Sequence, residues 1–343
     1  MNTLQFLAVS LIWFALLAYG VFGGADFGGG IWDLLATGKR AVKQRQAIAK
    51  ALGPVWEANN VWLIFVIVGA FSCFPVVFSS LSIALSIPLT LALIGIVMRG
   101  SAFVFRAHAA GATGIDSIWG RVFSAASTIT PFLFGMCAAA IASGSIRVTN
   151  GNPTSDYVGS WTSPFAFACG AFALGMCSSL AATYLTVEAA SDQQYDLERS
   201  FRLKAIISGA VAAVVGLIAL LLAHFYAPAL WSGLLGKALP ITIGAMLVGL
   251  ATAFCLLTQR DRTARILLML EITAIFVAWA VAQAPALIVP DVTIANAASP
   301  DVTLKAFLIA STVGMIFFLP SLWFLFSVFK GENPHSQKQS ASS

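Results

Sequence analysis

Charged side chains are scarce in this sequence. Of its 343 residues, 10% are charged and 59% are hydrophobic, and the mean hydropathy is +0.89. A soluble globular domain carries about 25% charged and about 45–50% apolar residues. The shortage of charge excludes a soluble enzyme, a disordered chain and a nucleic-acid-binding module. We therefore expect an all-α, polytopic integral membrane protein that contacts lipid and no nucleic acid.

Patterns that bind metals or cofactors are also missing. The five cysteines lie apart in apolar stretches without a C-x-x-C pair, so we expect small buried residues in helix packing. The histidines His108, His224 and His335 are expected at three different depths, which prevents two of them from ligating one haem. A single haem ligand such as His224 stays as an alternative. We expect no haem or metal bound by this chain and no catalysis by this chain alone.

Long apolar runs dominate what is present. Each run of about 20 apolar residues is typical of a transmembrane helix. The predicted spans are 4–35, 57–74, 76–99, 122–143, 164–186, 205–227, 238–258, 266–285 and 304–329, nine in all. The first run is too long for a cleaved signal and is predicted to be retained.

These spans form one transmembrane domain over about 1–330. A natural division is a first four-helix bundle over about 1–143, a second over about 164–285, and a ninth helix at 304–329. The Ser/Gln-rich segment 331–343 is predicted to be a disordered tail.

The positive residues predict the orientation of the chain. All but three of the 19 Lys and Arg residues fall on one set of connections, and the exceptions are Arg147, Lys237 and Lys305. The positive-inside rule then puts the N-terminus outside and the C-terminus in the cytoplasm, which requires an odd number of spans. The corresponding location is the bacterial plasma (inner) membrane.

Three connecting segments and one glycine pattern complete this outline. Residues 38–52 are basic and partly amphipathic, so we expect them to lie along the inner surface. The outer loops 144–163 and 286–303 are polar and rich in turn residues, which favours irregular solvated connections. Gly20, Gly24 and Gly28 have the spacing of a close helix contact.

Ionisable residues within the spans are the candidate functional residues, because burying charge in hydrocarbon is costly. They are Asp26 and Asp33 in the first span, Glu57 at the start of the second, Arg99 at the end of the third, and Glu271 in the eighth. Their positions put Asp33, Glu57 and Arg99 in the cytoplasmic third of the membrane, with Asp26 deeper.

Two interpretations of these residues remain open. Asp26 and Asp33 are seven residues apart, on one helix face and about 10 Å apart along the axis. The first interpretation is that they form an acidic path for proton uptake from the cytoplasm, with Arg99 as a counter-charge. The alternative is a buried ion pair that only holds helices together.

The start of the second span carries further polar residues. Pro54 fits the first turn of a helix, and Glu57 lies near the positive helix end, which favours its ionised form. Trp56 and Asn60 share an adjoining face, and Asn59 and Asn60 can bind a partner helix or water.

Three segments together resemble a known family. They read G-G-A-D-F-G at 23–28, G-P-V-W-E-A-N-N-V-W-L-I at 53–64, and M-R-G-S-A-F-V-F-R at 98–106. The chain resembles subunit II of the cytochrome bd-type quinol oxidases, which include the cyanide-insensitive oxidases. The match is clear over about residues 15–110, and beyond them it depends on length, helix count and orientation.

The resemblance implies a partner and a function. It implies a heterodimer with a haem-bearing subunit I, which carries two b-type haems and haem d, and small accessory subunits can join. The complex oxidises quinol, reduces oxygen to water and takes protons from the cytoplasm. The resemblance gives Glu57 a role in proton delivery. The family often has a second acid three residues before Asp26, where this chain has Gly23.

Two other functions are weighed against this interpretation. Carboxylates in membranes also bind coupling ions, so a proton-coupled secondary transporter is the first alternative. The sequence lacks a clear inverted repeat and paired broken helices, which disfavours it. The second alternative is a purely structural scaffold subunit, which keeps the partner and has no proton role.

Overall fold

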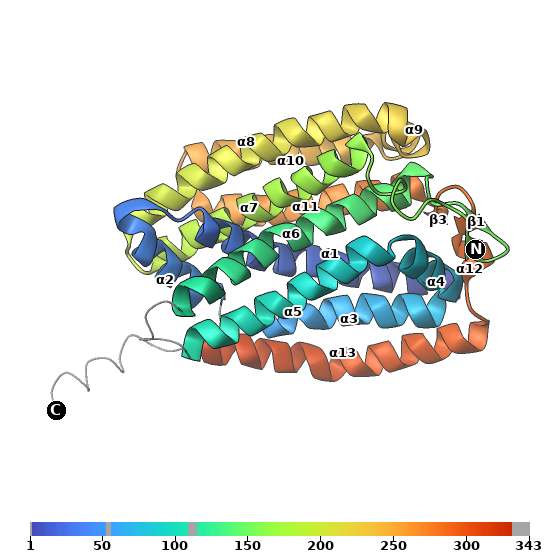
Figure 1. Ribbon diagram of the computed structural model, residues 1–343, viewed down its shortest axis with the longest axis horizontal. Coiled ribbons are helices and arrows are strands. Elements are labelled where there is room, and N and C mark those ends of the chain that lie inside the picture. Colours follow the sequence, from blue (N-terminus) through green and yellow to red (C-terminus); the bar gives the residue numbers. More distant parts are fainter. Residues whose placement is uncertain (1, 53–55, 109–114, 331–343) are drawn as a thin grey trace.

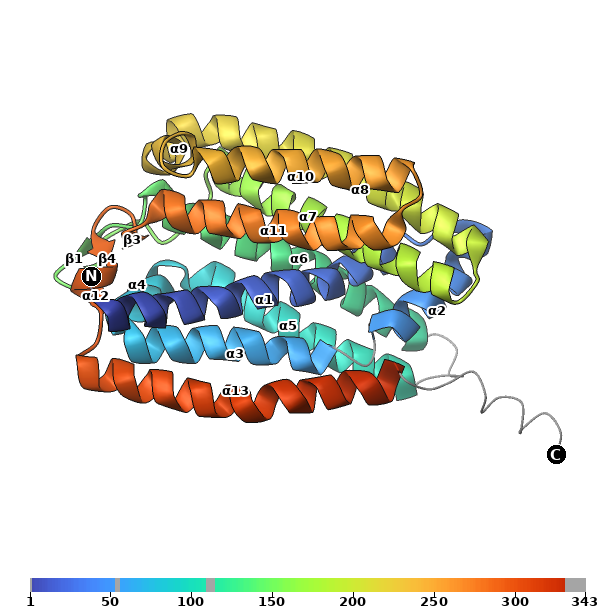
Figure 2. The ribbon, with the colours of Figure 1, turned by 180° about the vertical axis from the view of Figure 1, so that it is seen from behind.

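A computed structural model describes residues 2–52, 56–108 and 115–330, apart from the side chains of 39, 52, 56–58, 107–108, 115–117 and 325–330. Long helices lie side by side in one bundle, with the N-terminus at one end and Lys330 at the other (Figures 1 and 2). The long helices are α1 (Thr3–Leu34), α3 (Trp56–Cys73), α5 (Ser86–His108), α6 (Ile115–Ser143), α7 (Pro164–Ser191), α8 (Tyr195–Tyr226), α10 (Leu239–Leu257), α11 (Asp261–Gln283) and α13 (Asp301–Lys330).

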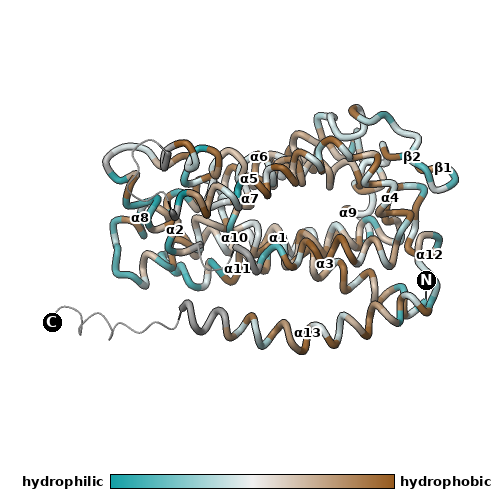
Figure 3. The backbone as a smooth tube through the Cα atoms, turned by 60° about the horizontal axis from the view of Figure 1, so that its bottom comes forward, coloured by the Kyte–Doolittle hydropathy of each residue, from teal (hydrophilic) through white to brown (hydrophobic). Residues whose placement is uncertain are grey.

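The number of spans agrees with the all-α membrane architecture predicted above. Within the described residues, eight helices are long and apolar enough to cross a membrane, or nine if a bent pair counts as one span. Brown hydrophobic segments occupy the middle of the bundle and teal hydrophilic ones gather at its two ends (Figure 3). This distribution is what a bilayer requires.

The predicted third span at 76–99 is wrong in its position. The apolar run is divided into a short helix, α4 (Pro75–Ala84), and the long α5, and α4 is bent by 118° from the end of α3. Pro75 lacks an N–H group and starts α4, after Phe74 has left helical geometry at φ −138° and ψ 62°. Hydropathy does not detect this break, because the residues on both sides of it are apolar. As a result α5 continues to residue 108, and Arg99 lies within the helix rather than at its end.

Several other helices are longer than the predicted spans at the same end of the bundle. For example, α8 begins at Tyr195 instead of 205, and α6 begins at Ile115 instead of 122. The added turns are polar, such as those with Asp196 and Glu198 at the start of α8. Apolar runs mark the thickness of the hydrocarbon, whereas hydrogen bonding lets a helix continue into the polar layer.

The basic segment after α1 packs on the bundle. It comprises a 3₁₀ turn at Gly38–Arg40 and α2 (Ala41–Leu52). Ile48 is buried against α7 and α8 residues, and Lys50 pairs with Asp192 at 2.7 Å. The Lys204 ammonium donates to the Gln44 side chain at 2.9 Å. The predicted amphipathic helix is therefore present, and its apolar side covers protein.

The two predicted irregular loops contain ordered structure. The first holds the β1–β2 hairpin (Val148–Thr149 and Asn152–Pro153), and the second holds β3 (Ala286–Ile288) and β4 (Val292–Thr293), followed by α12 (Ile294–Ala297). Arg147 and Asp291 join the two loops through an ion pair of 2.8 Å. Ile146 and Ile288 are fully buried beneath them, so these loops are less solvated than composition predicts.

Short helices follow the second long helix of each half. After α3 comes α4, and after α8 comes α9 (Pro228–Leu235), and both begin with proline. The order of long and short helices thus repeats along the chain. The two halves also contact each other closely, since α1 packs against α7 as well as α6.

Glycines on α1 allow this close packing. A Cβ atom on Gly28 would lie 1.9 Å from the Cys177 carbonyl oxygen of α7, and one on Gly24 would touch the side chain of Leu180. Gly20 faces the ring of Phe276 on α11. The predicted role of these glycines in helix packing is confirmed, because the neighbouring backbone at Gly28 leaves no room for a side chain.

Candidate functional site

A buried ion pair joins α1 to α5. A terminal guanidinium nitrogen of Arg99 lies 2.6 Å from Asp26 Oδ1, and both residues are buried. Arg99 Nε also donates to Ser127 Oγ of α6 at 3.1 Å. The guanidinium lies over the rings of Phe27 and Phe123, at 5.0 and 5.3 Å from their centroids. Arg99 is therefore held by a carboxylate, a hydroxyl and two aromatic faces.

A second charged contact lies closer to the end of the bundle that holds α2. Arg106 donates to both carboxylate oxygens of Asp33 at 3.2 Å, and Ser124 Oγ donates to Oδ2 at 3.0 Å. Arg45 of α2 approaches the same carboxylate at 4.0 Å and donates to the Ala36 carbonyl. Arg106 and Ser124 thus donate hydrogen bonds to one buried carboxylate, and Arg45 adds a positive charge nearby.

The two contacts repeat with the same spacing on α1 and α5. Asp26 and Asp33 are seven residues apart on α1, and Arg99 and Arg106 are seven apart on α5. Seven residues span about 10 Å of helix, and α1 and α5 run in the same direction (Figure 1). Ser127 and Ser124 are one turn apart on α6. We name these six residues the polar seam.

The polar seam corrects one prediction about Arg99. It was expected level with Asp33, but it pairs with the deeper Asp26, and Arg106 takes the place beside Asp33. The cause is the start of α5 at Ser86, which moves the helix by about ten residues relative to the predicted span. Sequence reasoning also missed Ser124 and Ser127. The seven-residue spacing of the two arginines, matched to that of the two aspartates, is the signal that identifies the pairing.

Glycines bring the three helices close enough for the seam to form. A Cβ atom on Gly30 of α1 would lie 2.2 Å from Ser127, and one on Gly95 of α5 would lie 2.2 Å from Thr130 Oγ1. Both glycines face hydroxyl groups of α6. Larger residues at these positions would separate α1 and α5 from α6 and lengthen the contacts of the seam.

The start of α3 borders the seam. Asn59 is buried and its amide donates to the Phe22 carbonyl at 3.3 Å, beside Asp26. The side chains of Trp56 and Glu57 lie outside the described residues. Their backbone forms the first turn of α3, and α3 runs antiparallel to α1. Glu57 therefore comes two residues nearer than Asn59 to the end of the bundle that holds α2.

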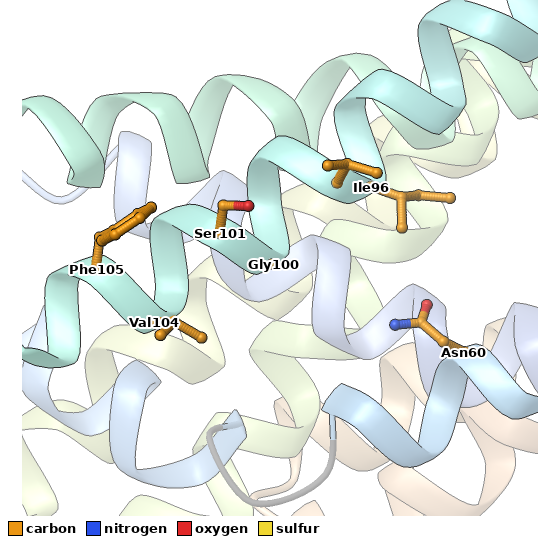
Figure 4. Close-up of a pocket in the computed structure, with 7 residues that line it drawn as sticks. Asn60, Ile96, Gly100, Ser101, Val104 and Phe105 are labelled. Atoms are coloured by element: carbon orange, nitrogen blue, oxygen red, sulfur yellow. The ribbon is translucent and has the colours of Figure 1, made fainter.

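Asn60 lies in a groove rather than in the seam. The groove has a volume of about 460 Å³ and opens at the surface between α3 and α5 (Figure 4). Ser101 and Gly100 contribute its other polar surface, and Ile96, Val97, Val104 and Phe105 line the rest. The groove therefore presents hydrogen-bonding groups on an otherwise apolar face.

Glu271 is separate from the other acids. It lies on α11, opposite Gly249 of α10, where a Cβ atom would be 2.7 Å from its carboxylate. No ion pair or hydrogen bond joins it to a side chain that the structure describes. Glu271 is not brought together with Asp26 or Asp33.

The described residues offer no cluster suited to a metal. Among them, no group of three or more His, Cys, Asp and Glu side chains lies close enough to hold an ion. The His224 ring lies in the last turn of α8 against Phe225 and Trp231, with centroids at 4.9 and 5.3 Å. The side chain of His108 and all of His335 lie outside the described residues. That this chain binds no haem stays a prediction.

Chemically, the polar seam is a line of charges inside an apolar bundle. A buried ion pair gains Coulomb energy but loses the hydration of both ions, and removal of one partner leaves a costly charge. Carboxylates held this way can also exchange protons with water that enters the bundle. The geometry is thus compatible with both interpretations of the sequence.

Known proteins are similar to this chain in sequence and in fold. The family model for cytochrome bd terminal oxidase subunit II matches residues 4–329. A Bacillus subtilis protein named "Putative cytochrome bd menaquinol oxidase subunit II" is 23% identical and covers 98% of this chain and 99% of its own length. A second B. subtilis protein, cytochrome bd ubiquinol oxidase subunit 2, is 29% identical over 36% of this chain and 38% of its own length. A chain in the structure of bd oxidase from Geobacillus thermodenitrificans has the same fold, with a TM-score of 0.74 and 23% identity over 97% of this chain and all of that one.

Proposed function

The chain belongs to the family of cytochrome bd terminal oxidase subunit II, a component of a membrane oxidoreductase complex, and from this premise we propose its role in that complex. It is the non-haem subunit of a quinol:oxygen oxidoreductase in the bacterial plasma membrane. It stabilises the haem-bearing subunit I and carries protons inward from the cytoplasmic face. The N-terminus lies outside, and α13 ends at the cytoplasmic side. The tail predicted at 331–343 lies outside the described residues.

The polar seam is the observation that carries the proton role. Its layer nearer the proposed cytoplasmic side contains Asp33. This layer lies near the end of α1, beside Arg45, whose side chain is 44% exposed. Its inner layer, at Asp26, lies about 10 Å deeper, where Asn59 of α3 adjoins it. A proton that enters near Asp33 would pass to Asp26 and Glu57 through water, because a carboxylate can accept and release a proton in turn.

The roles of the residues differ within this path. Glu57 is the primary proton carrier, since its motif is the most specific part of the family resemblance. Asp26 and Asp33 carry protons between water and Glu57, and Arg99 is the counter-charge of Asp26. Trp56 and Asn60 support the first turn of α3. Oxygen reduction takes place in subunit I, and the quinol and oxygen are substrates of the complex.

The face formed by α3, α5 and α13 is the proposed contact with subunit I. Its apolar side chains are well exposed, with Phe71 at 61%, Leu93 at 60% and Phe317 at 71%. The groove that contains Asn60 and Ser101 opens on this same face. Lipid chains cannot satisfy these polar groups, so a protein surface with matching donors and acceptors fits better. Small accessory subunits would bind elsewhere.

A scaffold without a proton role is the alternative that one observation favours. Asp33 already receives hydrogen bonds from Arg106 and Ser124, which is also how a purely structural ion pair is held. Family membership disfavours the other alternative, a secondary transporter. The two functions predict different turnover for variants that remove the charge of a carboxylate but keep its size: the proton path predicts a loss of turnover, and the scaffold predicts none.

Turnover of isosteric variants separates these two functions. We expect Glu57→Gln and Asp26→Asn to lower the quinol oxidase rate of the purified complex by at least about tenfold, while subunit I and its haem spectrum are retained. The matched control is Asp192→Asn, which removes an exposed carboxylate that pairs with Lys50. Normal turnover in both Glu57→Gln and Asp26→Asn, with full haem content, would leave only the scaffold function.

A further inference from the structure

The stripe of α1 that carries the two aspartates has a third polar member. Tyr19 comes seven residues before Asp26, so Tyr19, Asp26 and Asp33 follow one another on the same face. Tyr19 is buried, at 7% exposure. Its Cα atom lies about 10 Å along the helix axis from that of Asp26, on the side nearer the N-terminus. The proton path proposed above makes no use of it.

The Tyr19 hydroxyl is buried without a hydrogen-bond partner among the described residues. Its ring packs against Phe27 and Phe134, with centroids at 6.4 and 6.1 Å, and neither ring offers a conventional donor or acceptor. Buried hydroxyl groups in proteins are nearly always hydrogen-bonded to protein or to ordered water. We therefore expect a polar group or a water molecule to form a hydrogen bond with the Tyr19 hydroxyl.

The Asp26–Arg99 ion pair lies next along the same face. Arg99 holds Asp26 Oδ1 at 2.6 Å. Both Asp26 and Arg99 interact electrostatically with the Tyr19 hydroxyl, which itself has no hydrogen-bond partner among the described residues. An orphaned hydroxyl beside a buried carboxylate is a setting in which a bridging water is found.

Gly23 leaves the face of α1 between Tyr19 and Asp26 without a side chain. A Cβ atom there would lie 3.1 Å from the edge of the Tyr19 ring and 3.6 Å from the ring carbon that bears the hydroxyl. Gly23 is one turn after Tyr19 and three residues before Asp26, on the same side of the helix. The ring that bears the hydroxyl thus lies against the bare backbone at Gly23.

We propose that Tyr19 and Asp26 hold a buried water beside Gly23, and that Tyr19 positions this water to extend the proton path inward from Asp26. This inference rests on the proton function proposed above. The water accepts a proton from the Asp26 carboxyl group and gives one of its own toward subunit I, where the proposed reduction of oxygen to water consumes it, so the bridging water is unchanged afterwards. Asp26 is left ionised beside Arg99. Tyr19 fixes the water by hydrogen bonding and does not ionise.

Two variants of the complex test this inference. Tyr19→Phe removes only the hydroxyl, and Gly23→Ala puts a methyl group where the water would lie while keeping both polar groups. We expect each to lower quinol oxidase turnover about fivefold, the effect of one lost hydrogen bond. Because both remove the same water, the double variant should be no slower than either single one. The control is Tyr226→Phe at the exposed end of α8, which should keep full turnover.

An infrared measurement separates a positioned water from mere packing. The carboxyl band that disappears in Asp26→Asn should shift in Tyr19→Phe and in Gly23→Ala, but not in Tyr226→Phe. An unshifted band contradicts the proposal, whether or not turnover falls, and so does unchanged turnover in both variants. If Asp26→Asn and Glu57→Gln are themselves fully active, the proton path is refuted. If those two are slow and Tyr19→Phe is normal, only the role of Tyr19 is refuted.

Discussion

Removal of Arg99 alone should be more damaging than removal of the whole ion pair. Arg99→Leu leaves the Asp26 carboxylate in the bundle without its 2.6 Å counter-charge, and it leaves Ser127 without its 3.1 Å donor. Breaking one side of a buried pair typically costs about 3–5 kcal/mol, whereas replacing both partners by apolar residues is often neutral. Both residues are less than a tenth exposed, at 4% for Asp26 and 6% for Arg99, so solvent offers little compensation.

Thermal stability of the assembled complex provides the assay. We expect Arg99→Leu to lower the apparent Tm and the yield of haem-containing complex strongly. The double variant Asp26→Leu with Arg99→Leu should recover most of the stability but not the oxidase activity. Arg199→Leu, which removes an arginine outside the seam, is the matched control. A double variant that is as unstable as Arg99→Leu would refute the account of the Asp26–Arg99 pair.

Three further perturbations probe other parts of the chain. Gly28→Ala should prevent α1 from packing on α7 and abolish assembly, because the new methyl group would lie 1.9 Å from the Cys177 carbonyl oxygen; Gly244→Ala, in open space, should assemble normally. The pKa of Asp291 is lowered below its ordinary value of 3.8, mainly by hydrogen bonds from Arg147 and then from the Val148 N–H. A lowered folded-state pKa means that this contact stabilises the fold above about pH 4 and is lost as the pH falls through the lowered pKa, so the difference in Tm between the wild type and Asp291→Asn should vanish in acid. His224→Leu should leave the haem spectrum of the complex intact, and loss of one haem would show that this chain supplies a ligand.

Sequence patterns predicted the membrane architecture well and the pairing of the site residues poorly. The positions of Asp26 and Asp33 on one face of α1 follow directly from their spacing, since an α-helix repeats nearly every seven residues. Their partners depend on where α5 begins, and that boundary lies inside an apolar run where Pro75 starts a separate short helix. An error of ten residues in this boundary put Arg99 at the depth of Asp33, whereas it pairs with the deeper Asp26.

The remaining differences arise from tertiary contacts. Ser124 and Ser127 look like ordinary small residues of a transmembrane helix, and only the packing of α6 against Gly30 brings them to the charges. The outer loops look solvated by composition, but Ile146 and Ile288 anchor them to the bundle. Neither contact leaves a signal in a single sequence, because each joins segments that are far apart along the chain.

Proton uptake by the complex in oriented vesicles tests the central claim most directly. A pH indicator on the cytoplasmic side would report protons taken up as oxygen is reduced, with Glu57→Gln and Asp26→Asn compared against Asp192→Asn. The account predicts that both Glu57→Gln and Asp26→Asn slow uptake from this side in step with turnover, while Asp192→Asn matches the wild type. Uptake at the normal rate in Glu57→Gln and Asp26→Asn, with haem content unchanged, would contradict it.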